Sequence, residues 1–329
     1  MLALWVPLPM GEQRGFALPL LFRLYVGANR GGTKDAPGRP RRGTRRRAAG
    51  DAHAAHPRPT KLALARALVA LVTGGADGRT VHAVVDSASA ARPLLEGRPA
   101  NVPVLSRLRP DAAPGARPGR RRPGQRGRPR REGHRRPTPK ALAATRRRWD
   151  ARSVTLYGRH VTPLVFGCTA LRYGALRDQP VRIVVVRAPG GRRREEAFCC
   201  TDLTVDHAVI LEGYARRWTI EAAFHDQKQP LGFEDPQNRA ATAVARTAPP
   251  AGIVYDLVLL WYAARVQHGR AAGWTVRPWY RPKSTPSFLD LLTAIRQDSR
   301  RRHFSDPPSP TPVAQNSPPL GDHAPQVAA

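Results

Sequence analysis

The chain has 329 residues, and its 55 lysines and arginines against 24 aspartates and glutamates give a formal net charge of +31 at pH 7. This length is enough for one large domain or two smaller ones, and 41% hydrophobic residues are enough for a core. The 28 glycines and 34 prolines stay below the share typical of a wholly disordered chain. These figures exclude an acidic extracellular protein, a collagen-like or coiled-coil fibre and a multi-span membrane protein.

The excess positive charge favours a polyanionic partner, because like charges at this density repel one another unless something neutralises them. Nucleic acid is the first candidate, and an anionic membrane surface is the alternative. Only five of the basic residues are lysines, so nearly all of the charge is arginine. With the many alanines, glycines and prolines, this usage is typical of a GC-rich genome, and we expect part of the charge to reflect codon bias.

The chain opens with alternating apolar and basic segments. Residues 2–8 and 16–25 predict two strands joined by a polar turn. Residues 30–59, rich in arginine, glycine and proline, predict a solvated loop. Thr60 then offers an N-cap for a helix that a pair of glycines ends at Gly75.

Two further strands follow this helix. Residues 81–85 are apolar with turn residues on both sides, which is typical of a buried strand, and this strand ends at Asp86. Residues 88–95 predict a short helix broken by Pro93, and residues 102–108 predict the second strand.

A second low-complexity stretch at 110–148 consists mainly of arginine, proline and glycine. Its Arg-Gly-Arg-Pro segment at 126–129 equals the core of an AT-hook, which binds the minor groove of DNA. Four residues match easily by chance in such a composition. We therefore favour a solvated loop that binds phosphates without sequence preference.

The second half of the chain begins with strands and ends with helices. Residues 153–157 and 161–166 predict strands, and residues 181–187 and 195–201 predict a hairpin turned at 189–191. Helices follow, and Asp206 is the expected N-cap of one that runs to Pro230. An apolar helix is predicted at 253–266, and we expect it to be too short to span a bilayer. The tail beyond residue 304 is expected to be disordered.

The helix after Asp206 contains the strongest candidates for catalytic and phosphate-binding side chains. At 100° per residue, Tyr214, Arg217, Glu221 and Lys228 share a stripe about 60° wide. A carboxylate can hold a divalent cation, while guanidinium, ammonium and phenol groups can bind phosphate oxygens, so the stripe suits phosphodiester chemistry. Spacing alone favours the alternative of an exposed helix with ordinary surface ion pairs.

The pattern Tyr-x2-Arg-x3-Glu-x6-Lys, with Trp218 beside the arginine, resembles the signature around the catalytic glutamate of cut-and-paste DDE transposases from bacterial insertion sequences. The strand that ends in Asp86 resembles the one that presents the second aspartate of that family. Further segments that resemble family motifs are Thr201-Asp202, residues 228–232, residues 235–237, residues 107–109 and residues 126–130.

The resemblance implies an RNase H-like catalytic domain, of mixed α/β class, that cleaves and transfers DNA strands with two Mg²⁺ or Mn²⁺ ions. It implies that Asp86 and Glu221 are catalytic and metal-binding, and that Tyr214, Arg217 and Lys228 bind or support the DNA phosphate. It also implies transposon ends and target DNA as partners, a homodimer in a synaptic complex, no membrane, and a nucleoid-associated location in the bacterial cytoplasm.

The first aspartate of the family would lie upstream of Met1. We therefore expect an N-terminally truncated transposase that lacks its first strand, has an incomplete catalytic triad and is inactive as given. One alternative is a non-catalytic, basic DNA-binding remnant of a decayed transposase. Another is a relic that does not fold stably, because part of a sheet leaves edges exposed.

The same resemblance predicts how the chain is divided. Residues 1–109 are the first part of the core, and residues 110–150 are a basic linker or insertion. Residues 151–303 complete the core with the glutamate-bearing helix and the C-terminal helices, and residues 304–329 are a disordered tail.

Overall fold

The computed structural model describes residues 1–7, 15–25, 59–120, 123–124, 126–188, 194–238, 240–270 and 285–305. The basic loop predicted at 30–59 lies outside these ranges except for its last residue. The turn predicted at 189–191 lies outside them, and so does the predicted tail at 304–329, apart from residues 304 and 305, which are helical.

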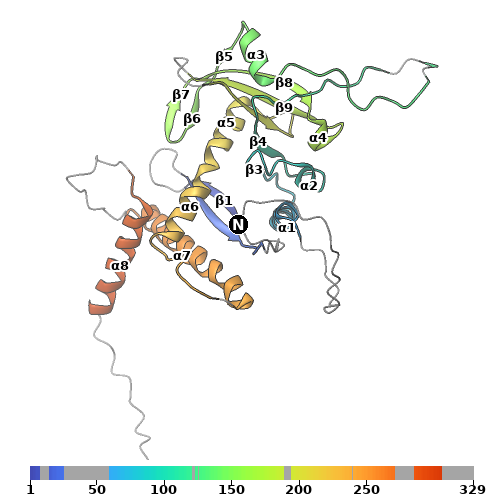
Figure 1. The fold of residues 1–329 in the computed structure, drawn as a ribbon. Helices are drawn as coiled ribbons and strands as arrows, with labels where there is room; N and C mark the ends of the chain where they lie inside the picture. Colours follow the sequence, from blue (N-terminus) through green and yellow to red (C-terminus); the bar gives the residue numbers. More distant parts are fainter. Residues whose placement is uncertain are drawn as a thin grey trace, which may run out of the picture.

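A six-stranded sheet forms the upper part of the molecule in Figure 1. In the order of the sheet, its strands are β3 (Ala83–Val85), β4 (Val104–Leu108), β10 (Glu196–Cys200), β9 (Pro180–Arg187), β8 (Leu164–Leu171) and β5 (Asp150–Ala151). β3 and β4 are parallel, and every other neighbouring pair is antiparallel. The predicted mixed α/β class is therefore confirmed, and so is the pairing of the strands predicted at 181–187 and 195–201.

The sheet is apolar on both faces, because β8, β9 and β10 are nearly continuous runs of hydrophobic residues. One face packs against the short helices α2 (Arg92–Leu95), α3 (Pro139–Thr145) and α4 (Tyr173–Leu176). The other face packs against α5 (His207–Arg216) and the hairpin of β6 (Val154–Leu156) and β7 (Arg159–Val161). Cys199 and Cys200 lie on opposite faces of the sheet, as neighbours on a strand must.

Two of the short helices differ from prediction. Pro93 lies in the first turn of α2 and does not break it, because a proline there loses no intrahelical hydrogen bond. α3 lies within the stretch predicted as a solvated loop, and the hydroxyl of its N-cap Thr138 accepts a hydrogen bond from the amide of Ala141 at 3.2 Å.

The N-terminal strands β1 (Leu2–Pro7) and β2 (Gly15–Leu21) form a separate two-stranded antiparallel sheet. This pairing confirms the predicted N-terminal strand pair. This sheet packs against α6 (Trp218–Lys228) and α7 (Ala241–Gln267), and α7 packs against α8 (Phe288–Ser305) (Figure 1). The rings of Tyr255 and Phe288 stack between α7 and α8 with their centroids 4.6 Å apart. α8 falls among the C-terminal helices expected before residue 303, although no residue range was predicted for it.

The remaining helices bear on two expectations. α1 (Lys61–Gly74) begins at Thr60, whose hydroxyl accepts from the amide of Ala63 at 3.2 Å, so the predicted N-cap is confirmed. α7 is much longer than the helix predicted at 253–266, so the expectation that it is too short to span a bilayer is wrong. Its 26-residue part Thr242–Gln267 is long and apolar enough for that by length and composition.

Candidate active site

The predicted site lies where α5 and α6 meet. The carboxylate of Asp206 accepts from the amide of Ala208 at 2.7 Å, which confirms this residue as the N-cap of α5. The expected single helix is, however, divided at Arg217, where the amide bonds to the carbonyl of Tyr214, three residues back, at 3.1 Å. The Thr219 hydroxyl donates to the carbonyl of Arg216 at 2.7 Å and stabilises the tight turn.

The guanidinium of Arg217 is the centre of this site. Its Nη1 forms an ion pair with Oε1 of Glu221 at 2.9 Å. Its Cζ lies 5.5 Å from the ring centroid of Tyr214 and 5.4 Å from that of Trp218, within the range of cation–π attraction. The side chain of Arg217 is 19% exposed and that of Glu221 is 45% exposed, so the carboxylate is the solvent-facing member of the pair.

The electrostatics of Arg217 fit this position. Burial is the largest single influence and acts against the charged form, but the hydrogen bonds and charges of Glu221 and Tyr214 together outweigh it and raise the pKa of Arg217. Its Nε atom is buried and has no partner among the residues that the structure describes. The guanidinium is therefore permanently charged and has hydrogen-bonding capacity left.

Asp86, at the end of β3, lies within electrostatic range of the same guanidinium. It is exposed directly after β3, and one carboxylate oxygen accepts from the amide of Ser89 at 2.6 Å. Hydrogen bonds from Ser89 lower the pKa of Asp86 below its ordinary value of 3.8, and the positive charge of Arg217 lowers it further. Arg217 thus forms an ion pair with Glu221 and acts on Asp86 through its charge alone, although these two carboxylates come from segments far apart in the sequence.

The predicted stripe is only partly assembled. Tyr214, Arg217 and Glu221 are in contact, whereas the ammonium of Lys228 forms an ion pair with Glu234 at 2.5 Å. Lys228 lies about two helical turns beyond Glu221, at the end of α6. The structure therefore does not place it beside the other residues of the stripe.

Tyr157 belongs to this neighbourhood and was missed by the sequence analysis, which placed it in a strand. It is the first residue of the two-residue turn between β6 and β7, with a left-handed φ of 55°. Its side chain hydrogen-bonds with Trp218, and burial is the main reason why its pKa is raised. Tyr157 is still 63% exposed and Trp218 is 50% exposed. The Tyr-Gly pair at 157–158, flanked by short strands, is the signal that could have shown the turn.

The site has few metal-binding groups. Within the described ranges there is no group of three or more histidines, cysteines, aspartates and glutamates that could hold a metal ion. What the site offers is the pair Asp86 and Glu221. Mg²⁺ commonly binds through one or two carboxylates and completes its shell with water and phosphate oxygens, so two carboxylates are compatible with it.

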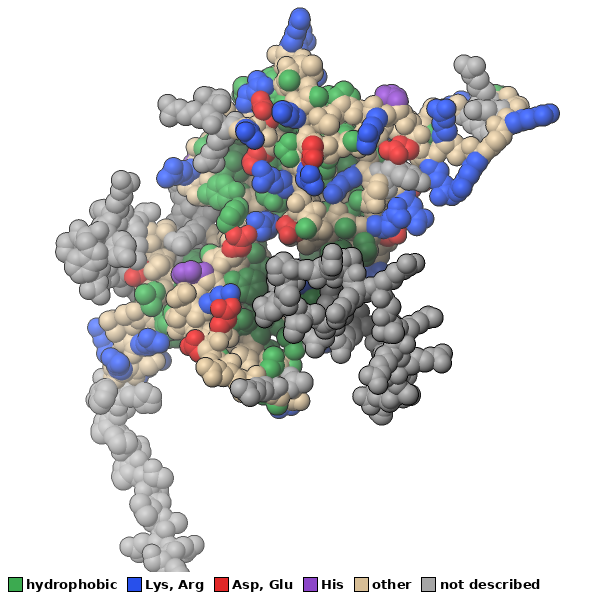
Figure 2. All heavy atoms as spheres, in the orientation of Figure 1, with side chains coloured by type: hydrophobic (Ala, Val, Ile, Leu, Met, Phe, Trp, Pro, Cys, Tyr) green, Lys and Arg blue, Asp and Glu red, His purple; other side chains and the backbone are tan. Residues whose placement is uncertain are grey.

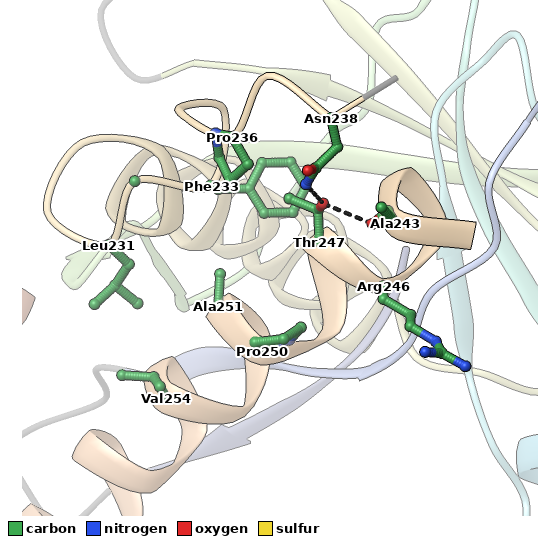
Figure 3. A pocket seen from close by; sticks show the side chains of 11 residues that line it. Leu231, Phe233, Pro236, Asn238, Ala243, Arg246, Thr247, Pro250, Ala251 and Val254 are labelled. Carbon is green, nitrogen blue, oxygen red and sulfur yellow. Dashed lines mark hydrogen bonds between the residues drawn. The ribbon is translucent and has the colours of Figure 1, made fainter. Parts of the chain in front are cut away.

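An open pocket of about 580 Å³ lies elsewhere, between the loop after α6 and the first half of α7 (Figure 3). Leu231, Phe233 and Val254 give it apolar walls, and Arg246 lies at its rim. None of the predicted site residues lines it. The candidate site is therefore a surface at the helix joint and not this pocket.

Comparison with known proteins assigns no family. No family model matches the chain, and no curated protein matches it significantly. The resemblance to transposases therefore rests on the sequence motifs alone.

Proposed function

We propose that the chain is a transposase-type protein whose Asp86 and Glu221 act together in cleaving and transferring DNA strands, and that this pair retains activity without the first aspartate that the resemblance implies. The observation that carries the proposal is that Arg217 is ion-paired with Glu221 and also lies within electrostatic range of Asp86. The two carboxylates come from separate motifs, one after β3 and one in α6.

The surrounding fold supports an RNase H-like core. The short parallel pair of β3 and β4 has Asp86 directly after its first strand. α5, which leads into the glutamate-bearing α6, packs on the face of the same sheet through Ile210 and Leu211. This arrangement is compatible with a second carboxylate at a strand end and a third on a helix, as the resemblance implies.

Asp86 and Glu221 would hold the divalent cation, Mg²⁺ or Mn²⁺. When bound, the cation supplies activation of a water or 3′-hydroxyl nucleophile and stabilisation of the leaving oxygen. Because its pKa is lowered, Asp86 is ionised at neutral pH and needs no proton loss to act as a ligand.

The basic and aromatic residues would position the DNA. Arg217 can exchange Glu221 for a phosphate oxygen, because a guanidinium binds both anions with similar geometry. Tyr214, in contact with Arg217, limits the positions that this guanidinium can take. The exposed rings of Tyr157 and Trp218 offer surfaces on which an unpaired base can stack. Lys228 would contact the DNA backbone farther along α6.

The proposal is tested by nicking of supercoiled plasmid in Mg²⁺ by the protein and by Glu221→Gln. The matched control is Glu96→Gln, because Glu96 forms the same kind of i,i+4 pair with Arg92 at 3.4 Å on α2. Removing a metal-binding carboxylate is expected to lower the nicking rate at least about 100-fold. The control should retain the full rate. Equal nicking by all three proteins would refute the role of Glu221.

A non-catalytic DNA-binding protein is the second candidate. It is favoured by the absence, within the described ranges, of a third acidic, histidine or cysteine side chain that would complete a metal-binding group. DNA binding without any Mg²⁺-dependent nicking, in the protein and in Glu221→Gln alike, would support this candidate instead.

A further inference from the structure

A basic arm projects from the edge of the six-stranded sheet (Figure 1). We define it by residues 116–120, 123–124 and 126–134. Its described arginines are all exposed, and none of them forms an ion pair within the described part of the chain; they are Arg117, Arg120, Arg126, Arg128, Arg130 and Arg131. Figure 2 shows this arm as a row of blue side chains that extends away from the body of the molecule. Its sequence contains a single acidic residue, Glu132.

The arm is fixed at its root. Gly115 and Leu171 exchange two backbone hydrogen bonds of 2.8 Å each, which join the segment that leads into the arm to the end of β8. The segments that lead into and out of the arm, its two legs, are also joined to each other. The amide of Ala116 donates to the carbonyl of His134 and the amide of Gly133 donates to the carbonyl of Ala116, both at 2.9 Å. A Cβ atom at Gly133 would lie 2.5 Å from the carbonyl oxygen of Arg117, so glycine lets the legs approach this closely.

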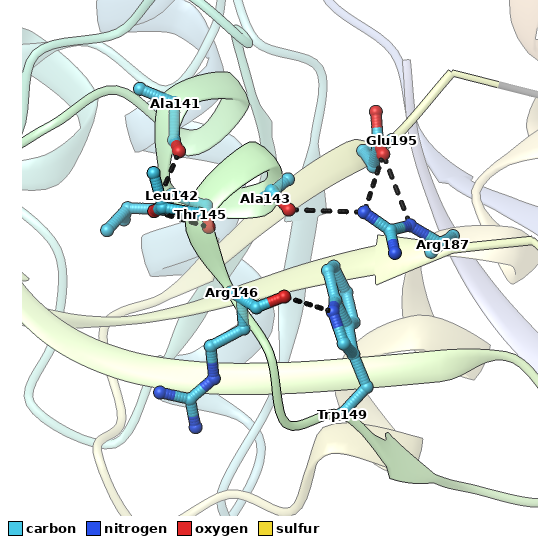
Figure 4. Close-up of polar contacts among 8 residues, drawn as sticks. All are labelled: Ala141, Leu142, Ala143, Thr145, Arg146, Trp149, Arg187 and Glu195. Carbon is cyan, nitrogen blue, oxygen red and sulfur yellow. Dashed lines mark hydrogen bonds and ion pairs between the residues drawn. The ribbon is translucent and has the colours of Figure 1, made fainter.

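The chain after the arm is also held on the sheet. The guanidinium of Arg136 donates to the carbonyl of Thr169 in β8 at 2.7 Å. In Figure 4, Arg187 of β9 pairs with Glu195 and donates to the carbonyl of Ala143 in α3 at 3.1 Å. The indole of Trp149 donates to the carbonyl of Arg146 at 3.2 Å. Both ends of the arm are therefore attached to the sheet, so its arginines project from a fixed position on the protein surface.

From this arrangement we infer that the arm binds the phosphate backbone of double-stranded DNA. Arginine suits phosphate because its planar guanidinium can donate two parallel hydrogen bonds. Attachment at the root reduces the ordering that binding requires. The inference rests on the proposed function only for the choice of DNA, and it needs neither Asp86 nor Glu221.

The composition of the arm argues against other polyanions. Residues 117–131 are arginine, proline, glycine and glutamine only. They include no apolar anchor of the kind that membrane-surface segments use and no aromatic ring for stacking on single strands. The narrow minor groove of duplex DNA attracts arginine, whereas the major groove of duplex RNA is too deep and narrow for side chains to read.

The test compares two triple variants that each remove three positive charges. The arm variant is Arg126→Gln, Arg128→Gln and Arg130→Gln, and the control is Arg296→Gln, Arg300→Gln and Arg301→Gln, all exposed on α8. Binding to a short duplex of random sequence is measured by fluorescence anisotropy over a range of salt concentrations, without divalent metal. Each backbone contact contributes about 0.9 to the slope of log K against log salt, so the arm variant should lose up to about 2.7 of that slope. The control should keep it.

The outcomes separate the arm from the catalytic proposal. Equal slopes for the arm variant and the α8 control would overturn the inference, and so would arm-dependent binding that is as strong on duplex RNA or anionic vesicles. Retained binding by Glu221→Gln, together with the slope loss in the arm variant, would support it even if no protein nicks DNA. Lysine at the three arm positions should restore the slope, and thermal unfolding should be the same for all variants.

Discussion

At the scale of single residues, Arg217 organises the candidate site. It is the half-buried member of a pair whose carboxylate faces solvent, and it touches an aromatic ring on each side. A lysine could keep the charge but not the planar contacts with the rings of Tyr214 and Trp218. The geometry of the site therefore depends on a guanidinium and not only on a positive charge.

A second residue, Asp256 in α7, provides a prediction that does not depend on function. Burial raises the pKa of Asp256 to about 7, and its Oδ1 atom is buried without a partner in the described part of the chain. Because the folded state binds this proton more tightly than the unfolded chain, stability falls as the pH rises from about 4 through 7. Asp256→Asn should therefore raise the free energy of unfolding by about 1–2 kcal/mol at pH 8 and have little effect at pH 4. Urea unfolding at both pH values checks this, and an equal effect at the two would contradict it.

At the scale of secondary-structure elements, the N-cap of α5 offers the clearest test. The hydrogen bond from the amide of Ala208 lowers the pKa of Asp206, so the cap stabilises the fold when this carboxylate is ionised. Asp206→Ala should lower the free energy of unfolding by about 1 kcal/mol at pH 7. The loss should disappear as the pH falls through the lowered pKa of Asp206, which is below 3.8.

The measurement is urea unfolding of the variant and the protein at pH 7 and at pH 3. Asp111→Asn serves as a control, because Asp111 is exposed and pairs only with Arg109 within the described residues. A pH-independent loss in Asp206→Ala would mean that the side chain acts through packing and not as a charged cap.

The elements also show which local signals the sequence carries. Thr60 and Asp206 precede apolar helical patterns, and both caps could be predicted because capping is local. Thr138-Pro139 is an equally good start for α3, but the arginine- and proline-rich surroundings concealed it. The division at Arg217 could not be predicted, because neither glycine nor proline marks it and a side-chain bond from Thr219 accompanies it.

At the scale of the whole molecule, the strand pairs at the N-terminus and at 181–201 were predictable because each joins neighbours in the sequence. The motifs of Asp86 and Glu221 were also predictable one by one. Their placement in one site is implied only by the resemblance and by no local pattern, because it depends on how β3 and the junction of α5 and α6 are placed by two separate cores. The sequence also located much of the basic charge at 110–148, but not the attachment of this stretch to the sheet at both ends, which depends on contacts distant in the sequence.

The central claim is that Asp86 and Glu221 form one site, and plasmid nicking in Mg²⁺ by Asp86→Asn, Glu221→Gln and the double variant tests it most directly. Residues that act as a unit are not additive, so each single variant should lose as much activity as the double variant. Smaller single losses that add up to the loss in the double variant would contradict the claim. So would nicking that is unchanged in either single variant.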